Sequence, residues 1–227
     1  MLSRFAIAVL VGLAAIVPTR AAEVKLGTTS IVLTTPTGFC ALIDGHPVDA
    51  PAVAGARKAV LPGHLLAQFA DCGQLTGWRA GTRAVLDDVF HYATRPTMMQ
   101  ADGRASEAEI KGFCAYVRAE GAKMFRGLAA DLKARVEAAT NGVKVNESRL
   151  IGVVAEEPVA CYWAIVQKIL TDTGAPKTNI AVSAIMLVKA KLVTGVMTSL
   201  YANAGSLDAP LAKQRRTVAE LMAANRP

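Results

Sequence analysis

The clearest hydrophobic pattern along the chain runs from about Ser106 to Thr140. Apolar residues recur there at spacings of three and four, which is the period of one helix face. They are Ile110, Phe113, Cys114, Val117, Met124, Phe125, Leu128, Leu132 and Val136. Ser106 and Glu109 match the capping box that begins a helix. The pattern therefore predicts one long helix, and a break near Gly121 is compatible with it because glycine weakens a helix interior.

Shorter runs of β-branched, aromatic or alternating apolar residues predict strands. They are Ser30–Thr35 with Phe39–Leu42, His64–Leu75, Arg83–Thr94, Arg149–Ala155, Val159–Leu170, Asn179–Val188 and Lys191–Tyr201. Two of these runs, 83–94 and 159–170, are also compatible with helix; Pro96 after the first favours a strand there. The segment 44–62, rich in glycine and proline, predicts a loop with at most one helical turn around residues 52–58.

Residues 206–224 again show helical spacing and predict a C-terminal helix. Residues 180–201 have the length of a membrane span, but Lys189 and Lys191 lie at the centre, where charge is costly in a bilayer. Two strands joined by a tight turn at 188–191 explain the same residues. The expected fold class is α+β, a mostly antiparallel sheet packed by one long helix and the C-terminal helix.

The first 21 residues have the three parts of a secretory signal peptide. Arg4 is followed by an apolar run of about 13 residues, which is shorter than the roughly 20 that a membrane-spanning helix needs. Cleavage after Ala21 would leave residues 22–227, a length that suits a single α+β domain. We expect a periplasmic or secreted protein with no stable membrane insertion after cleavage.

Charge and cysteine content refine this picture. The formal net charge of +7 falls to +5 when Arg4 and Arg20 are removed with the signal peptide. The densest basic cluster, at residues 213–216, has no interleaved aromatic residues, so it predicts a solvated helix face and no nucleic-acid partner.

All four cysteines follow residue 21, and export would place them in an oxidising compartment where an even count favours disulfide bonds. Three connectivities are possible. We favour Cys40 with Cys72, since both lie in runs taken as core strands, and Cys114 with Cys161, which lie in the later elements.

Two segments carry candidate chemistry. Asp44, His46 and Asp49 share a short loop that could contribute metal ligands, although Asp, Gly and Pro are also typical of turns. Asp87, Asp88 and His91 would bring a carboxylate and an imidazole onto one face of a helix. On a strand, Asp87 and His91 would lie about 13 Å apart, and Asp88 would point to the other face.

No nucleophile, phosphate-binding or dinucleotide-binding motif accompanies these residues. We therefore assign no catalytic, cofactor-binding or metal-binding residue from the sequence, and we expect no cofactor.

The segment Ile31–Phe39, a strand running into Pro-Thr-Gly-Phe, is similar to the opening of the Mog1/PsbP-like group. The strands joined at Lys189–Lys191 and the closing helix also resemble that group, and the resemblance covers about a third of the chain. It implies an antiparallel sheet with packed helices and a role in binding a partner. The chain also resembles exported proteobacterial proteins without an assigned function.

These observations favour an exported, non-catalytic binding or accessory domain whose partner is a protein or a small ligand. Two alternatives stay open: a periplasmic hydrolase-type enzyme whose site has no local signature, and a metal-binding protein. An enzyme would need His64 or His91 to converge with carboxylates in a pocket. A binding domain would not.

Overall fold

A computed structural model of the chain describes residues 22–139, 142–171 and 173–226. The expected signal peptide, residues 1–21, lies outside these ranges, and so does Thr140, where the long helix was expected to end. The first strand begins at Ala22, the residue that follows the expected cleavage point.

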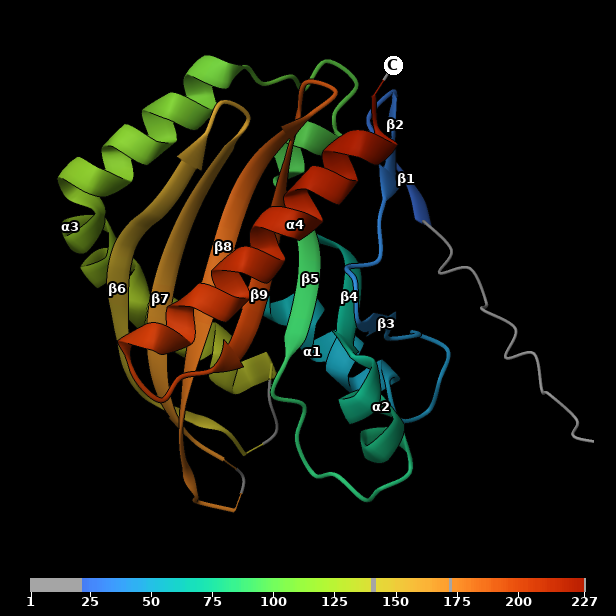
Figure 1. Ribbon diagram of the computed structural model, residues 1–227, viewed down its shortest axis with the longest axis vertical. Coiled ribbons are helices and arrows are strands. Elements are labelled where there is room, and N and C mark those ends of the chain that lie inside the picture. Colours follow the sequence, from blue (N-terminus) through green and yellow to red (C-terminus); the bar gives the residue numbers. More distant parts are fainter. Residues whose placement is uncertain (1–21, 140–141, 172, 227) are drawn as a thin grey trace, which may run out of the picture.

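An antiparallel sheet of seven strands forms the centre of the structure, in the order β3-β4-β5-β9-β8-β7-β6 (Figure 1). Its strands are β3 (Phe39–Ala41), β4 (His64–Asp71), β5 (Val89–Thr94), β6 (Lys144–Glu157), β7 (Ala160–Leu170), β8 (Pro176–Val188) and β9 (Lys191–Leu200). A separate antiparallel hairpin consists of β1 (Ala22–Leu26) and β2 (Thr29–Leu33).

Helices cover both faces of the sheet. They are α1 (Ala50–Ala59), α2 (Cys72–Arg79), α3 (Glu107–Ala139) and α4 (Asp208–Ala224), with short 3₁₀ helices η1 (Pro96–Met99) and η2 (Ala204–Leu207). Helix α4 crosses the front face over β8 and β9, whereas α3 packs on the opposite face against β6, β7 and β8 (Figure 1). The α+β fold class, with its long helix and its C-terminal helix, is confirmed.

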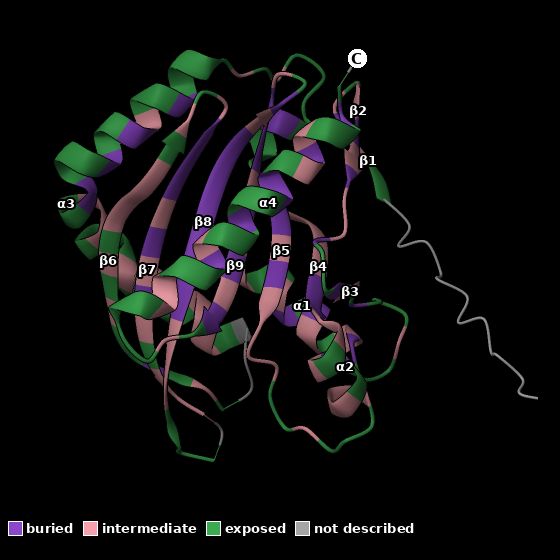
Figure 2. Cartoon of the chain, viewed as in Figure 1, coloured by how far each residue is buried: buried purple, intermediate pink, exposed green. Residues whose placement is uncertain are grey.

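The core lies on both faces of the central strands, which are almost continuously buried (Figure 2). On the α4 side, Met197 and Phe90 pack with Val218 and Leu221. This double burial explains why residues 159–170 fitted a helical period: a strand covered on both faces has no polar alternation. The run is strand β7.

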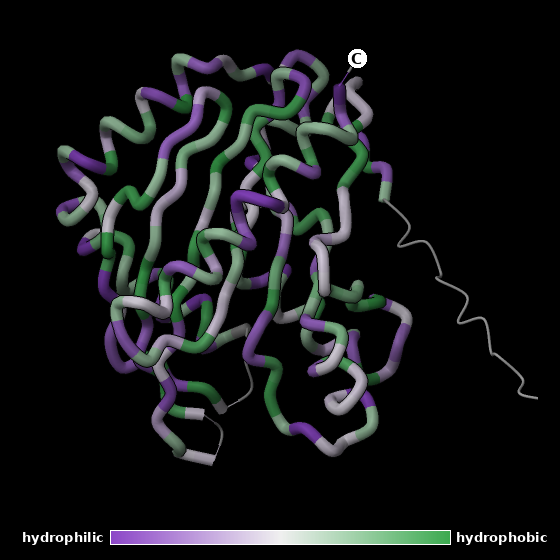
Figure 3. Tube along the Cα trace, in the orientation of Figure 1, coloured by the Kyte–Doolittle hydropathy of each residue, from purple (hydrophilic) through white to green (hydrophobic). Residues whose placement is uncertain are grey.

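The long helix is amphipathic, and hydrophilic and hydrophobic residues alternate along it (Figure 3). The Ser106 N–H donates to Glu109 Oε2 at 2.8 Å, as the capping pattern predicted. The helix is continuous through Gly121, although Figure 1 shows that α3 changes direction along its length. A Cβ at Gly121 would lie 2.9 Å from Leu150 Cδ2, so the missing side chain makes room for Leu150 on β6.

The predicted tight turn between β8 and β9 is confirmed. Lys189 and Ala190 form it, with φ angles of 48° and 60°. Lys191 then turns inward and is only 2% exposed. Its ammonium group donates to the backbone carbonyl of Met98 in η1 and to those of Gln100 and Gly103 in the loop that follows. This charge is thus held inside the fold by the chain itself.

Three sequence expectations about the first half of the chain are wrong, wholly or in part. The segment 44–62 holds the ten-residue helix α1, because Pro51 lies in its first turn, where proline is tolerated, and Gly55 is buried. The run 64–75 is strand only to Asp71. There the Asp71 side chain accepts from Gln74 N at 3.1 Å and caps helix α2.

The run 83–94 is strand only from Val89. Residues 83–88 do not join the sheet, since the Gln74 side-chain carbonyl accepts the N–H groups of Asp87 and Asp88 instead.

Both predicted disulfide bonds are present. Cys40 and Cys72 join β3 to the first residue of α2, with α-carbons 4.9 Å apart. Cys114 and Cys161 join α3 to β7, with α-carbons 5.7 Å apart. None of the helices in the described ranges has the length and apolar character needed to cross a membrane.

The first hairpin is bound to the end of α4 by one amide side chain. Asn225 Oδ1 accepts from Val32 N at 2.9 Å, and Asn225 Nδ2 donates to Val32 O at 2.7 Å. The side chain therefore takes the place of a neighbouring strand on the open edge of β2. The end of α4 and the hairpin meet at the upper right of the molecule in Figure 1.

Candidate functional site

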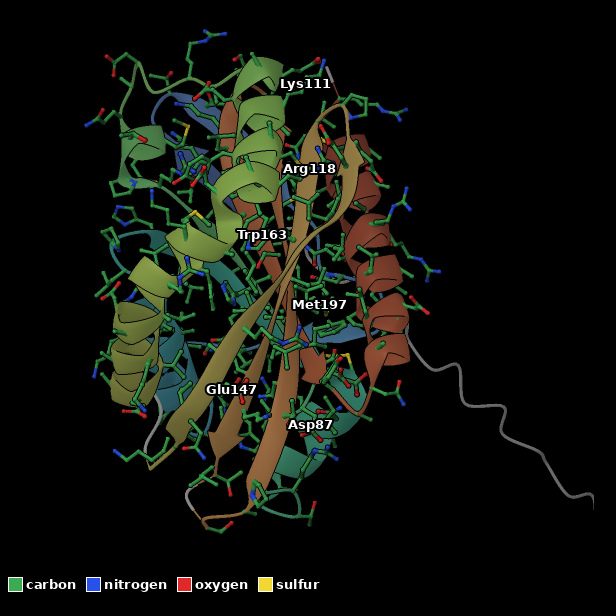
Figure 4. All side chains as sticks on the ribbon, turned by 90° about the vertical axis from the view of Figure 1, so that its left-hand side faces the viewer. Asp87, Lys111, Arg118, Glu147, Trp163 and Met197 are labelled. Carbon is green, nitrogen blue, oxygen red and sulfur yellow. A yellow bond between two sulfur atoms is a disulfide. The ribbon has the colours of Figure 1, made fainter. Side chains whose placement is uncertain are left out.

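Two open hollows lie next to each other where β9 leads into α4. The first, called the Asp88 hollow, measures ≈ 330 Å³ and is lined by Gln74, Asp87, Asp88, Ser199, Leu200, Ser206, Ala209, Pro210 and Lys213. The second, called the Arg149 hollow, measures ≈ 300 Å³ and is lined by Glu147, Arg149, Val166, Lys168, Thr178, Tyr201 and Ala202. They are neighbours because Leu200 and Tyr201 are consecutive. In Figure 4, Asp87 and Glu147 both lie in the lower half of the molecule.

Asp88 is fixed in its hollow by neutral hydrogen-bond donors. Ser199 Oγ donates to Oδ1 at 2.6 Å, and Gln74 Nε2 donates to Oδ2 at 2.8 Å. The described residues place no cation within ion-pair distance of this carboxylate. The Asp88 hollow therefore presents an ordered carboxylate that can accept hydrogen bonds from a bound group.

Asp87 has a different environment, since its carboxylate is paired with Lys177 and Arg83. Burial raises the pKa of Asp87, but the hydrogen bonds and charges of Lys177 and Arg83 outweigh this effect and hold the pKa below its ordinary value of 3.8. Asp87 is thus ionised near pH 7, its negative charge is compensated by the two cations, and it is not poised to exchange a proton.

His91 does not join these aspartates. It lies within β5, opposite Gln68 of β4 and Val196 of β9. Burial lowers the pKa of His91 to about 4, so the ring is neutral near pH 7. In the described part of the chain, no hydrogen bond links it to Asp87 or Asp88. The acid/base arrangement that a helix would have produced is therefore not formed.

The loop that could have offered metal ligands has its carboxylates occupied. Asp44 pairs with Arg57 through both oxygens, at 2.8 and 3.1 Å. Asp49 is fully buried, bonded to Arg79 and to Ile43 N, and His46 Nδ1 lies 3.3 Å from its Oδ1. No group of three or more metal-ligating side chains occurs among residues 22–139, 142–171 and 173–226. These residues form a structural tie between the loop, α1 and α2.

His64, the remaining histidine, is exposed at the first residue of β4, where it pairs with Thr94 across the strands. It lines neither hollow. The groups that do converge, Gln74, Lys177 and Ser199, were not singled out from the sequence. They come from α2, β8 and β9, and no local pattern signals a site assembled from elements more than a hundred residues apart.

Comparison with known proteins gives only weak likenesses, and these are to solved structures. No family model matches the sequence, and no match is found among curated proteins. Among solved structures, the Ran-binding protein Mog1p of Saccharomyces cerevisiae is similar at 10% identity, over 91% of this chain and 93% of that one, with a TM-score of 0.31. A point mutant of Mog1 gives the same identity and TM-score over 90% and 92%. The likeness agrees with the weak resemblance to the Mog1-like group noted in the sequence.

Proposed function

We propose that this chain is an exported, non-catalytic binding domain, and that it contacts its partner at the end of the sheet where the two hollows lie. One observation carries the proposal: Leu200, an apolar side chain that is 50% exposed, lines the Asp88 hollow, and the next residue, Tyr201, lines the Arg149 hollow. Protein interfaces commonly have an apolar centre with a polar rim, and Leu200 with the charged and polar residues of the two hollows fits this arrangement.

The state of the charged groups supports binding over catalysis. Asp88 is held by neutral donors, Asp87 by two cations, and His91 is neutral and separate from both. Such groups are fixed recognition elements. The two disulfide bonds support export, because they persist in oxidising compartments.

Site-specific photo-crosslinking tests the proposed contact. A photoreactive residue replaces Leu200 in one protein and Leu128 in a control protein, and both are expressed with the full leader. Leu128 lies on α3 and is 47% exposed, which matches Leu200 closely. We expect a discrete adduct from position 200 and none from position 128. Equal adduct formation at the two positions would contradict the proposal.

A second experiment addresses the enzyme alternative. His46 and His64 are changed to alanine, and the half-buried His91 to glutamine, which keeps a polar side chain of similar length. We expect the adduct at position 200 to persist, since none of the three lines a hollow. A loss of about a hundredfold in an assigned activity, the scale of a removed general base, would support the enzyme instead.

A further inference from the structure

The Arg149 hollow contains a cation that no carboxylate fully neutralises. Arg149 and Lys168 stand on adjacent strands of one sheet face, because Arg149 pairs with Val166 and Lys168 with Glu147 across β6 and β7. Glu147 accepts from Lys168 Nζ at 2.6 Å. In the described residues Arg149 has no ion pair of its own. Two cations therefore share one carboxylate, and the hollow has a surplus positive charge.

Neutral donors complete the same wall. Thr178 lies opposite Lys168 on β8, and the Tyr201 N–H donates to Thr178 O at 2.9 Å, which fixes the position of the tyrosine beside the hollow. Within the described ranges, neither side-chain hydroxyl has a hydrogen-bond partner. Val166, only 6% exposed, contributes an apolar surface.

We infer that the Arg149 hollow is an oxyanion subsite, which takes a carboxylate or phosphate group between Arg149 and Lys168 and a short apolar body against Val166 and Tyr201. The guanidinium group suits this role because it can offer paired donors to two oxygens of one anion. Diagonal neighbours on adjacent strands are separated by about 7–8 Å, a span that two long side chains can close around one anionic group.

Glu147 is the resident competitor of such an anion. The Lys168 hydrogen bond, the Lys168 charge and the nearby Arg149 charge together lower the pKa of Glu147, so it is ionised near neutral pH. Its pair with Lys168 is exposed on both sides, at 54% and 61%. Exposed pairs of this kind are weak, and an entering oxyanion can therefore displace the carboxylate from Lys168.

This inference deepens the function proposed above and rests on it: one of the two hollows would receive an anionic group of the partner or of a small ligand. Isotope-labelled protein without the leader, residues 22–227, is titrated with inorganic phosphate and with butyrate at low ionic strength. We expect saturable amide shifts in the nuclear magnetic resonance spectrum centred on Val166, Lys168, Tyr201 and Ala202. Shifts scattered over all basic residues would overturn the inference.

Four variants sharpen the test. R149Q should weaken binding about fivefold to tenfold, and K168Q at least as much, because it also frees Glu147 to pair with Arg149. E147Q should tighten binding about threefold, since it removes the competitor. R126Q changes an exposed arginine of α3 and should leave affinity within twofold. A tightening by E147Q that R149Q does not reverse would contradict the subsite.

Competition separates the two sources of the anion. Saturating phosphate should suppress the adduct at position 200 if the partner supplies the anionic group, and leave it intact if a small ligand does. An adduct at position 200 without saturable binding of phosphate or butyrate would contradict the subsite and leave the proposed function standing. Equal adducts at positions 200 and 128, together with saturable anion binding, would contradict the proposed function and leave the subsite standing.

Discussion

The two disulfide bonds anchor regions that are stabilised in different ways. Cys114 and Cys161 are both 0% exposed and lie among Ile110, Ile185 and Leu192, between α3 and the sheet. This region, strands β6–β9 with α3 and α4, is called the covered half. Cys40 and Cys72 are only half-buried and belong to β3, β4, α1 and α2, called the corner.

The corner has a smaller apolar cluster, whose buried members are Leu42, Val53, Ala70 and Leu75. It also contains polar ties, above all the pair of the buried Asp49 with Arg79. Apolar burial stabilises in proportion to the area removed from water, whereas a buried ion pair is stabilising only while both partners are present. The comparison predicts that different substitutions lower the free energy of unfolding in the two regions.

The largest expected effect is the loss of the buried disulfide. Replacing Cys114 and Cys161 together with alanine opens a cross-link between residues 47 apart in sequence. We expect the free energy of unfolding to fall by about 4 kcal/mol from chain entropy, and further from lost packing in the covered half. Denaturant unfolding measures this. The same change at Cys40 and Cys72, with a separation of 32, should cost less; an equal or greater cost would break the comparison.

Next in size is the buried ion pair of the corner. Arg79→Ala leaves the carboxylate of Asp49 buried without its cation, and breaking a buried pair costs about 3–5 kcal/mol. We expect the lower end, because Arg79 is 28% exposed. Arg57→Ala is the matched control: it breaks the exposed pair with Asp44 and should cost less than about 1 kcal/mol. Similar losses in the two variants would show that burial of Asp49 does not matter.

Close packing in the covered half gives the third prediction. Gly195 lies beneath α4, where Gln214 Nε2 donates to its carbonyl at 3.0 Å. A Cβ there would meet Gln214 Nε2 at 2.8 Å and Phe90 Cζ at 3.0 Å. Gly195→Ala should therefore cost about 1–3 kcal/mol. Gly112→Ala, on the exposed side of α3 with open space around it, should instead stabilise by up to about 1 kcal/mol. The same sign in both variants would contradict this.

The smallest effect is in acid. The hydrogen bond from Arg79 lowers the pKa of Asp49 below its ordinary value of 3.8. Its stabilising contribution is complete above that unfolded-state value and is lost as the pH falls through the lower folded value. Asp49→Asn should therefore flatten the dependence of unfolding free energy on pH below about 4. Asp44→Asn, in an exposed pair, should change this slope less, and identical slopes for wild type and Asp49→Asn would refute the prediction.

The covered half could be predicted from sequence far better than the corner. Periodicity over residues 106–140 and the capping pair Ser106 and Glu109 located α3, and the lysines at 189 and 191 located the turn between β8 and β9. In the corner, Pro51 and Asp71 were interpreted as a loop residue and a strand residue. Pro51 in fact lies in the first turn of α1, and Asp71 is both the last residue of β4 and the N-cap of α2; only their positions relative to the helices reveal these roles.

The hollows could not be predicted for a related reason. Ser199 and Asp88 are joined by a hydrogen bond across 111 residues, and their meeting depends on the strand order that places β9 beside β5. The sequence indicated the aspartates as candidates, but the partner it offered them was His91, their neighbour in the chain, and only if the segment were a helix. Residues that the fold brings together from distant strands have no characteristic spacing in the sequence.

The contact of Asn225 with Val32 joins positions 193 residues apart. A chain synthesised and threaded through a membrane from its amino end would have β1 and β2 ready long before residue 225 follows. Until then, the open edge of β2 would lack its cap, and unpaired strand edges invite pairing with other chains. A stalled or truncated chain would therefore expose a site for misassembly or for a chaperone, which the arrival of one amide side chain closes.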